Sequence, residues 1–284
     1  MTDVPQKHPT EGLRWQGEMG EKWNAHHEQF ESMIAPVGAA LIEAASLRPG
    51  ESVIDVGCGA GATSIEIARR IAPNGRVTGI DISPTLIRTA ERRAQAAGAA
   101  NAEFIVADAT SASFKSGFDC LFSRFGVMFF DDPYAAFANM RKFVKPGGRL
   151  IFSCWGPMPE NPWVQEAMGV VSRHKELPKP VPRAPSPFAF AETDYVRDIL
   201  EKARFAEISF TAWRGWQQVG GAGANARKAA QFLMDAAFAG DALAGEPQDL
   251  KDRVLADLVS LFAKYDGPDG VRTPAMAWLV SARS

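Results

Sequence analysis

Three glycines at positions 57, 59 and 61 follow the short apolar run VIDV and are the first residues in this sequence to suggest chemistry. A glycine turn between a strand and a helix lets backbone amides approach a ligand closely, and the helix start adds unpaired N–H groups. Ala62 completes the pattern Gly57-x-Gly59-x-x-Ala62, and Asp81 follows after the roughly 20 residues that place a carboxylate near a ribose diol. This motif predicts a nucleotide-like ligand, either a nicotinamide dinucleotide or S-adenosylmethionine.

Two further acidic residues favour S-adenosylmethionine over a nicotinamide dinucleotide. Asp55 lies inside the apolar run before the first glycine, where its carboxylate would repel a pyrophosphate but tolerate a sulfonium that carries an amino group. Asp108, in VADAT, ends another apolar run and could accept a hydrogen bond from an adenine amino group. None of the three tyrosines has a lysine four residues later, so the Tyr-x-x-x-Lys pair of a dehydrogenase is missing.

Apolar runs alternate with helical patterns between residues 50 and 156. Ser83 is the expected N-cap of one helix, which begins at Pro84 and stops at Gly98. Such alternation predicts a doubly wound α/β fold, with a mostly parallel sheet between two layers of helices. The expected strands span residues 52–58, 76–82, 102–109, 118–125 and 149–155, and the expected helices residues 61–72, 84–97 and 133–144.

The flanking segments predict additional helices. Residues 1–12 are expected to be a loose tail, and residues 13–47 helical with a break near Pro36. Eight prolines between Pro157 and Pro187 favour an irregular cap. Further on we expect helices at 192–203, 225–240 and 249–265, and strands at 206–214 and 273–284.

These elements predict four regions. They are an N-terminal tail and helical lid (1–47), a Rossmann-like cofactor-binding core (48–156), a Pro-rich cap (157–190), and a C-terminal part of the core (191–284) with a helical insertion at 225–265.

Five stretches together resemble class I, Rossmann-like S-adenosylmethionine-dependent methyltransferases, in the small-molecule group compared with ubiquinone/menaquinone-biosynthesis methyltransferases. The stretches are VIDVGCGAG (53–61), GIDIS (79–83), VADAT (106–110), FDCLFSRFGVMFFDDP (118–133) and KPGGRL (145–150). The resemblance implies a seven-stranded sheet whose last strand, at 273–284, is antiparallel, with an N-terminal helical lid and a helical insertion and cap.

The resemblance also implies a cofactor site. In it, Asp55 binds the amino group of the methionine part directly or through water, Asp81 binds both ribose hydroxyls, and Asp108 binds the adenine amino group. In this implied site, the backbone of the loop faces the methionine part at Gly57, Gly59 and Gly61. The adenine is contacted by Ile82 and Ala109. The cofactor and the acceptor pocket are faced by Ser123 and Arg124. We add the hypothesis that Trp23 lines the cofactor entrance.

The predicted reaction is methyl transfer by in-line displacement to O, N or C of a small apolar or aromatic molecule, with S-adenosylhomocysteine as product. The leaving group is neutral, so the protein mainly aligns donor and acceptor, and the sequence identifies no catalytic residue. Two alternatives stay open: an NAD(P)-dependent oxidoreductase, and a non-catalytic S-adenosylmethionine-binding protein.

The composition of the chain limits the classes of partner that we expect it to bind. The net charge is −2 and no Lys/Arg run exceeds a pair, so no nucleic-acid partner is expected. No metal-ligand pattern occurs, and no apolar stretch approaches the roughly 20 residues of a membrane span. The three cysteines are far apart, which suggests reduced thiols and a cytoplasmic protein. We expect a small-molecule acceptor as partner, and assembly into a homo-oligomer is compatible with the sequence.

Overall fold

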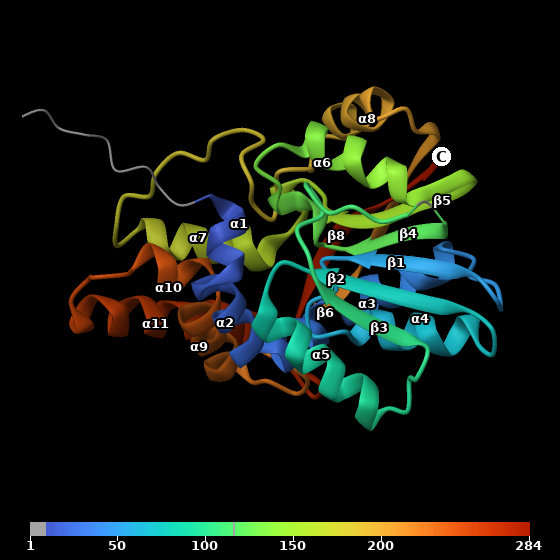
Figure 1. Ribbon diagram of the computed structural model, residues 1–284. Helices are drawn as coiled ribbons and strands as arrows, with labels where there is room; N and C mark the ends of the chain where they lie inside the picture. Colours follow the sequence, from blue (N-terminus) through green and yellow to red (C-terminus); the bar gives the residue numbers. More distant parts are fainter. Residues whose placement is uncertain (1–9, 116) are drawn as a thin grey trace, which may run out of the picture.

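The computed structural model describes residues 10–115 and 117–284. In these residues seven strands form one sheet in the order β3-β2-β1-β4-β5-β8-β6 (Figure 1). The strands are β1 (Ser52–Val56), β2 (Arg76–Asp81), β3 (Ala102–Val106), β4 (Phe118–Arg124), β5 (Val144–Trp155), β6 (Ala206–Gln218) and β8 (Gly270–Arg283). Strand β8 is antiparallel to both neighbours, and the first five strands pair in parallel. The predicted fold class is therefore confirmed; a two-residue strand, β7 (Asp266–Gly267), pairs with β8 beside this path.

Helices cover both faces of the sheet. Figure 1 shows α3 (His27–Ala44), α4 (Ala62–Ile71) and α5 (Pro84–Ala96) below the sheet, and α6 (Pro133–Met140) and α8 (Thr193–Lys202) above it. Helix α4 is amphipathic, and it buries Ile67 and Ile71 completely. Helix α5 begins as predicted, because the Ser83 side chain accepts a hydrogen bond from the amide of Leu86.

The N-terminal helices break at other places than predicted. Helices α1 (Glu11–Gln16), α2 (Glu18–Ala25) and α3 are separated at Gly17 and His26, whereas α3 continues through Pro36. Proline removes one helical hydrogen bond, but burial of apolar side chains on both sides of it outweighs that loss. The expected loose tail is wrong from Glu11 onward, and residues 1–9 lie outside the described part of the chain.

A second group of helices lies beside α1 and α2. It consists of α7 (Pro162–Ser172), α9 (Ala226–Ala236), α10 (Phe238–Ala242) and α11 (Gln248–Phe262), at the left of Figure 1. The helix expected at 225–240 is split at Ala237, whose backbone is extended. Within the described residues, no helix is both long and apolar enough to cross a membrane.

Candidate functional site

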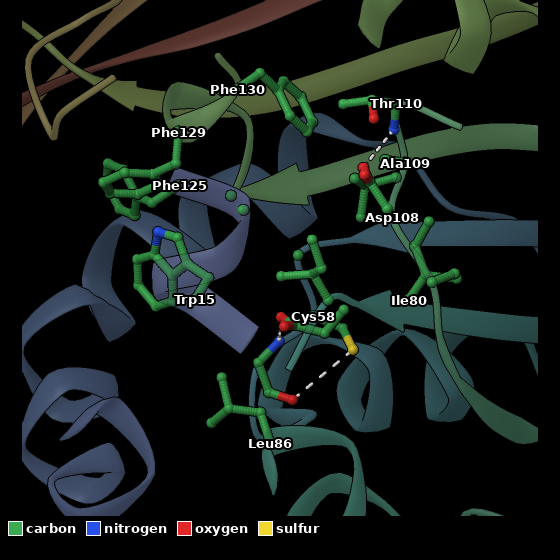
Figure 2. A pocket seen from close by; sticks show the side chains of 18 of the residues that line it. Trp15, Cys58, Ile80, Leu86, Asp108, Ala109, Thr110, Phe125, Phe129 and Phe130 are labelled. Atoms are coloured by element: carbon green, nitrogen blue, oxygen red, sulfur yellow. Dashed lines mark hydrogen bonds between the residues drawn. The ribbon is translucent and has the colours of Figure 1, made fainter. Parts of the chain in front are cut away.

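A cavity of about 430 Å³ lies at the carboxyl ends of the strands, beneath α1, α2 and α3 (Figure 2). Doubly wound sheets bind ligands at this edge. Most of the residues predicted for the site line this cavity: Trp23, Gly57, Gly59, Asp81, Ile82, Asp108, Ala109 and Arg124. The sequence therefore predicted the place of the cavity and most of its strand-end wall.

The glycine loop approaches its neighbours very closely. Gly57 has φ +67°, and a Cβ there would lie 2.9 Å from Cα of Gly126, in the loop after β4. Only glycine satisfies both conditions without strain. The two loops therefore meet at the floor of the cavity, where they join the carboxyl ends of β1 and β4.

Most N–H groups in the loop are already bonded within the protein. The amides of Gly57 and Cys58 donate to the carbonyl oxygen of Ile80, at 2.8 and 3.0 Å. The Gly59 amide donates to Asp81 Oδ2 at 2.9 Å, and the Gly61 amide donates to the carbonyl of Cys58. Our expectation that this loop offers free amides to a ligand is therefore wrong at these four positions.

Asp81 ends β2 with its carboxylate between the loop and the next helix. Its Oδ2 accepts from Gly59 N and its Oδ1 accepts from Ser83 N, both at 2.9 Å. Burial raises the pKa of Asp81, and the backbone N–H bonds act in the opposite direction. A carboxylate has about four acceptor positions, so each oxygen can still accept a hydroxyl from the cavity.

The cavity has a polar end and an aromatic end. At the polar end, Asp108 Oδ1 accepts from the amide of Thr110 at 2.8 Å, which fixes the carboxylate above β3. Figure 2 shows this end opposite a group of rings formed by Trp15, Phe125 and Phe129. Such an arrangement suits an elongated ligand with different chemistry at its two ends.

Three predicted residues do not line the cavity. Gly61 faces α5 and β3, where a Cβ would lie 2.9 Å from Cβ of Ala90. Ser123 is buried and donates its hydroxyl hydrogen to the carbonyl of Val56 at 2.7 Å, which ties β4 to β1. Asp55 is fully buried behind the loop. The first two support the site from behind, because their polar or packing contacts are made within the protein.

Asp55 is bonded to the start of α4. Its Oδ2 accepts from Thr63 Oγ1 at 2.8 Å and from Ser64 Oγ at 2.7 Å, while Oδ1 has no partner among the described residues. Burial raises the pKa of Asp55 to about 6, although the two hydroxyl bonds oppose that rise. The carboxyl group thus anchors the helix that follows the glycine loop.

Arg124 ends β4 and is the one cationic side chain that lines the cavity in the described residues. Burial lowers the pKa of its guanidinium, and the charges of Glu31 and Asp55 act against that decrease. Glu31 also lines the cavity, and Arg93 holds both of its oxygens at 2.7 and 2.8 Å. Among the described residues Arg124 forms no ion pair within 4.0 Å.

The N-terminal helices close the cavity with aromatic rings. Trp23 stacks on Phe30 with centroids 3.9 Å apart, and Trp15 meets the edge of Phe129 at 5.0 Å. Phe232 of α9 packs edge-on against Phe30 at 4.9 Å, so the helical insertion supports this wall. The sequence placed Trp23 here, but it gave no signal for Glu31, since one acid in an amphipathic helix does not show which surface it faces.

His27 and His174 do not line the cavity. His27 Nδ1 is 2.8 Å from the carbonyl oxygen of Asn24, and His174 Nε2 is 2.8 Å from Asp257 Oδ2, near α11. In the described residues no group of three or more His, Cys, Asp or Glu side chains could hold a metal ion.

Comparison with known proteins identifies the family. A family model described as a methyltransferase domain matches residues 47–204. The chain belongs to this family. The matched region contains the glycine loop and the acids that end β2 and β3, so the strand-end wall of the cavity belongs to the methyltransferase domain, while α1, α2 and α3 supply the wall outside it.

Relatives and solved structures agree with this assignment. Aklanonic acid methyltransferase DauC from Streptomyces sp. (strain C5) is 34% identical over 121 residues, which are 42% of this chain and 55% of DauC. Phosphoethanolamine N-methyltransferase 1 from Arabidopsis thaliana is 34% identical over 138 residues, 48% of this chain and 28% of that enzyme. The chain thus spans about half or less of these relatives. The YcgJ protein from Bacillus subtilis shares the fold, with a TM-score of 0.58, 18% identity, and coverage of 88% of this chain and 98% of YcgJ.

Proposed function

We propose that this protein is an S-adenosylmethionine-dependent methyltransferase that acts on a small apolar or aromatic acceptor. The observation that carries the proposal is the internal hydrogen bonding of the glycine loop. Four of its N–H groups are bonded within the protein, whereas a pyrophosphate needs free amides at this point. Together with the buried carboxyl group of Asp55 behind the loop, this favours a cationic sulfonium ligand over a nicotinamide dinucleotide.

The residues present fit that cofactor. Asp81 retains acceptor positions for two ribose hydroxyls, and Asp108 can accept from the adenine amino group at the polar end. Ile82 and Ala109 supply apolar surface beside them. The unpartnered Oδ1 of Asp55 can accept from the amino group through a water molecule, since the side chain itself does not reach the cavity lining.

The proposed role of the protein in the reaction is alignment. S-adenosylmethionine supplies, when bound, a methyl group on a sulfonium whose departure leaves a neutral thioether. Asp81 and Asp108 fix the position of the donor along the cavity, while Trp15 and Trp23 cover it and exclude water. The proton of a protonated acceptor atom has to leave before or during the transfer, and no side chain of the cavity is assigned to remove it.

The aromatic end supports an uncharged or cationic acceptor. Phe125 and Phe129 line it, and the exposed residues Asp131 and Asp132 line the same cavity. Asp131 Oδ1 accepts from the amide of Glu11, and Asp132 Oδ1 accepts from the amide of Ala135. A phosphate group there would meet like charges, and among the described residues Arg124 is the one cation in the lining.

Calorimetric titration tests the proposal. We expect S-adenosylhomocysteine to bind wild-type protein in the micromolar range and NADH not to bind. Asp81→Ala should lower the affinity for S-adenosylhomocysteine by about 100-fold, because two hydrogen bonds from the ribose hydroxyls to the carboxylate are lost. Asp249→Ala is the matched control, since Asp249 is exposed on α11. Tight NADH binding would support the oxidoreductase, and cofactor binding without turnover on any acceptor would support the non-catalytic protein.

We further propose a cytoplasmic location and no nucleic-acid partner. The three cysteines are buried and unpaired, which supports a reducing compartment. The net charge of −2 supports a small-molecule acceptor instead of a polyanion.

A further inference from the structure

We propose that Arg124 binds the carboxylate of the cofactor's methionyl half, and that it selects ligands in which the amino-acid half is intact. This inference rests on the proposed function, because it assumes an S-adenosyl ligand in the cavity. It assigns one chemical group of that ligand to one side chain.

The first support is an arginine without a partner. Arg124 lines the cavity, and none of its N–H groups makes a hydrogen bond to any described residue. A guanidinium presents five donors in a planar fork that matches a carboxylate. Leaving such a group enclosed and unpaired is costly, so a site that keeps it open is suited to an anion that arrives with the ligand.

Neighbouring acids do not supply that anion. Both oxygens of Glu31 are held by Arg93, which also donates to the carbonyl of Ala60 in the glycine loop at 2.8 Å. Asp55 directs its Oδ2 to two hydroxyl groups of α4. These acids keep the guanidinium charged through space, while its donors stay free for the ligand.

Helix α3 leaves room for the arginine. A Cβ on Gly38 would lie 3.0 Å from Cδ of Arg124 and 3.3 Å from its Nη1. These separations are tighter than ordinary van der Waals contacts, so a Cβ at Gly38 requires the Arg124 side chain to shift by a few tenths of an ångström. The side chain is thus held between the end of β4 and α3.

The strand order places Arg124 where the methionyl half must lie. In the order β3-β2-β1-β4, the strand ends carry Asp108, Asp81, the glycine loop and Arg124. Neighbouring strands are about 4.8 Å apart, so roughly 14 Å separate the first end from the last. An extended ligand with adenine at Asp108 and ribose at Asp81 continues over the loop and ends at Arg124.

A pair of ligands isolates the carboxylate. S-adenosylhomocysteine carries the amino-acid half, and 5′-methylthioadenosine has the same nucleoside and thioether without it. We expect Arg124→Gln to lower the calorimetric affinity for S-adenosylhomocysteine by about 10- to 100-fold, while the affinity for 5′-methylthioadenosine changes by less than about twofold. Gly38→Ala should also weaken the binding of S-adenosylhomocysteine relative to that of 5′-methylthioadenosine, but by a smaller factor.

Matched variants separate binding from folding. Gly169→Ala, in α7, places its Cβ in open space and should leave both affinities unchanged. Both Gly→Ala variants favour the helix, so a loss of affinity in Gly38→Ala cannot come from a weaker helix. Thermal unfolding of each variant confirms that it is folded.

Two results would overturn the inference. They are an unchanged affinity of Arg124→Gln for S-adenosylhomocysteine and an equal loss of affinity for both ligands. If the first came with a raised KM for an acceptor that bears a carboxylate, Arg124 would bind the anion of the acceptor instead. If wild-type protein binds neither ligand, the proposed function itself fails.

Discussion

Asp55 shows how a residue can belong to a motif without facing the ligand. The motif predicted its identity and its place before the glycines, but the side chain points to Thr63 and Ser64. Those hydroxyls belong to the first turn of α4, where a carboxylate satisfies donors near the helix start. The sequence motif does not show in which direction the Asp55 side chain points, because the residue types are the same for both orientations.

The pH dependence of stability tests the environment of Asp55. Its pKa rises from about 3.9 in an unfolded chain to about 6 in the folded protein. Between pH 4 and pH 6 the unfolded chain loses this proton while the folded protein keeps it. The wild type should therefore lose about 3 kcal/mol of unfolding free energy relative to Asp55→Asn as the pH rises through that window.

Urea unfolding at pH 4, 5, 6 and 7 measures the difference between these two proteins. We expect the difference to change up to about pH 6 and to stay constant above it. A difference that is the same at every pH would show that Asp55 titrates normally, and that its carboxyl group is hydrated.

At the scale of elements, the core strands and helices were predictable because each carries a local signal. Ser83 and Pro84 specify the start of α5, and the glycines specify the end of β1. The N-terminal helices were less predictable, since Pro36 suggests a break that burial of its neighbours overrides. Tertiary packing decided the outcome there, and propensity alone does not include it.

The wall formed by Trp23 allows a test of the helical lid. Trp23→Ala should weaken S-adenosylhomocysteine by about tenfold, because it removes an aromatic surface that stacks on Phe30 and borders the loop. Trp216→Ala serves as the control, since Trp216 is 53% exposed on β6, away from the cavity. Equal affinities of wild type and Trp23→Ala would show that the lid does not contribute to binding.

At the scale of the whole molecule, the cavity combines segments that are distant in the sequence. Glu31 and Arg124 lie 93 positions apart and share one wall, which only the packing of α3 against the sheet brings together. A motif search identifies the glycine loop and the strand-end acids, whereas the aromatic and charged walls depend on helices whose orientation the sequence does not state. The acceptor pocket was accordingly the least predictable part.

The charge of the aromatic end predicts which acceptors are used. Phenols and aromatic amines should support release of S-adenosylhomocysteine from S-adenosylmethionine, and phosphoethanolamine should not, because Asp131 and Asp132 repel its phosphate. The double variant Asp131→Asn, Asp132→Asn should reduce the difference in S-adenosylhomocysteine release between phosphoethanolamine and the aromatic acceptors. A preference of the wild type for phosphoethanolamine would show that the anion is bound by residues outside this wall.

A crystal structure of the protein with S-adenosylhomocysteine tests the central claim most directly. We predict the ligand in the cavity between the glycine loop and the lid, with its adenine amino group at Asp108, its ribose hydroxyls at Asp81 and its carboxylate at Arg124. A ligand bound elsewhere, or one in the reverse orientation with its carboxylate at Asp108, would contradict the account.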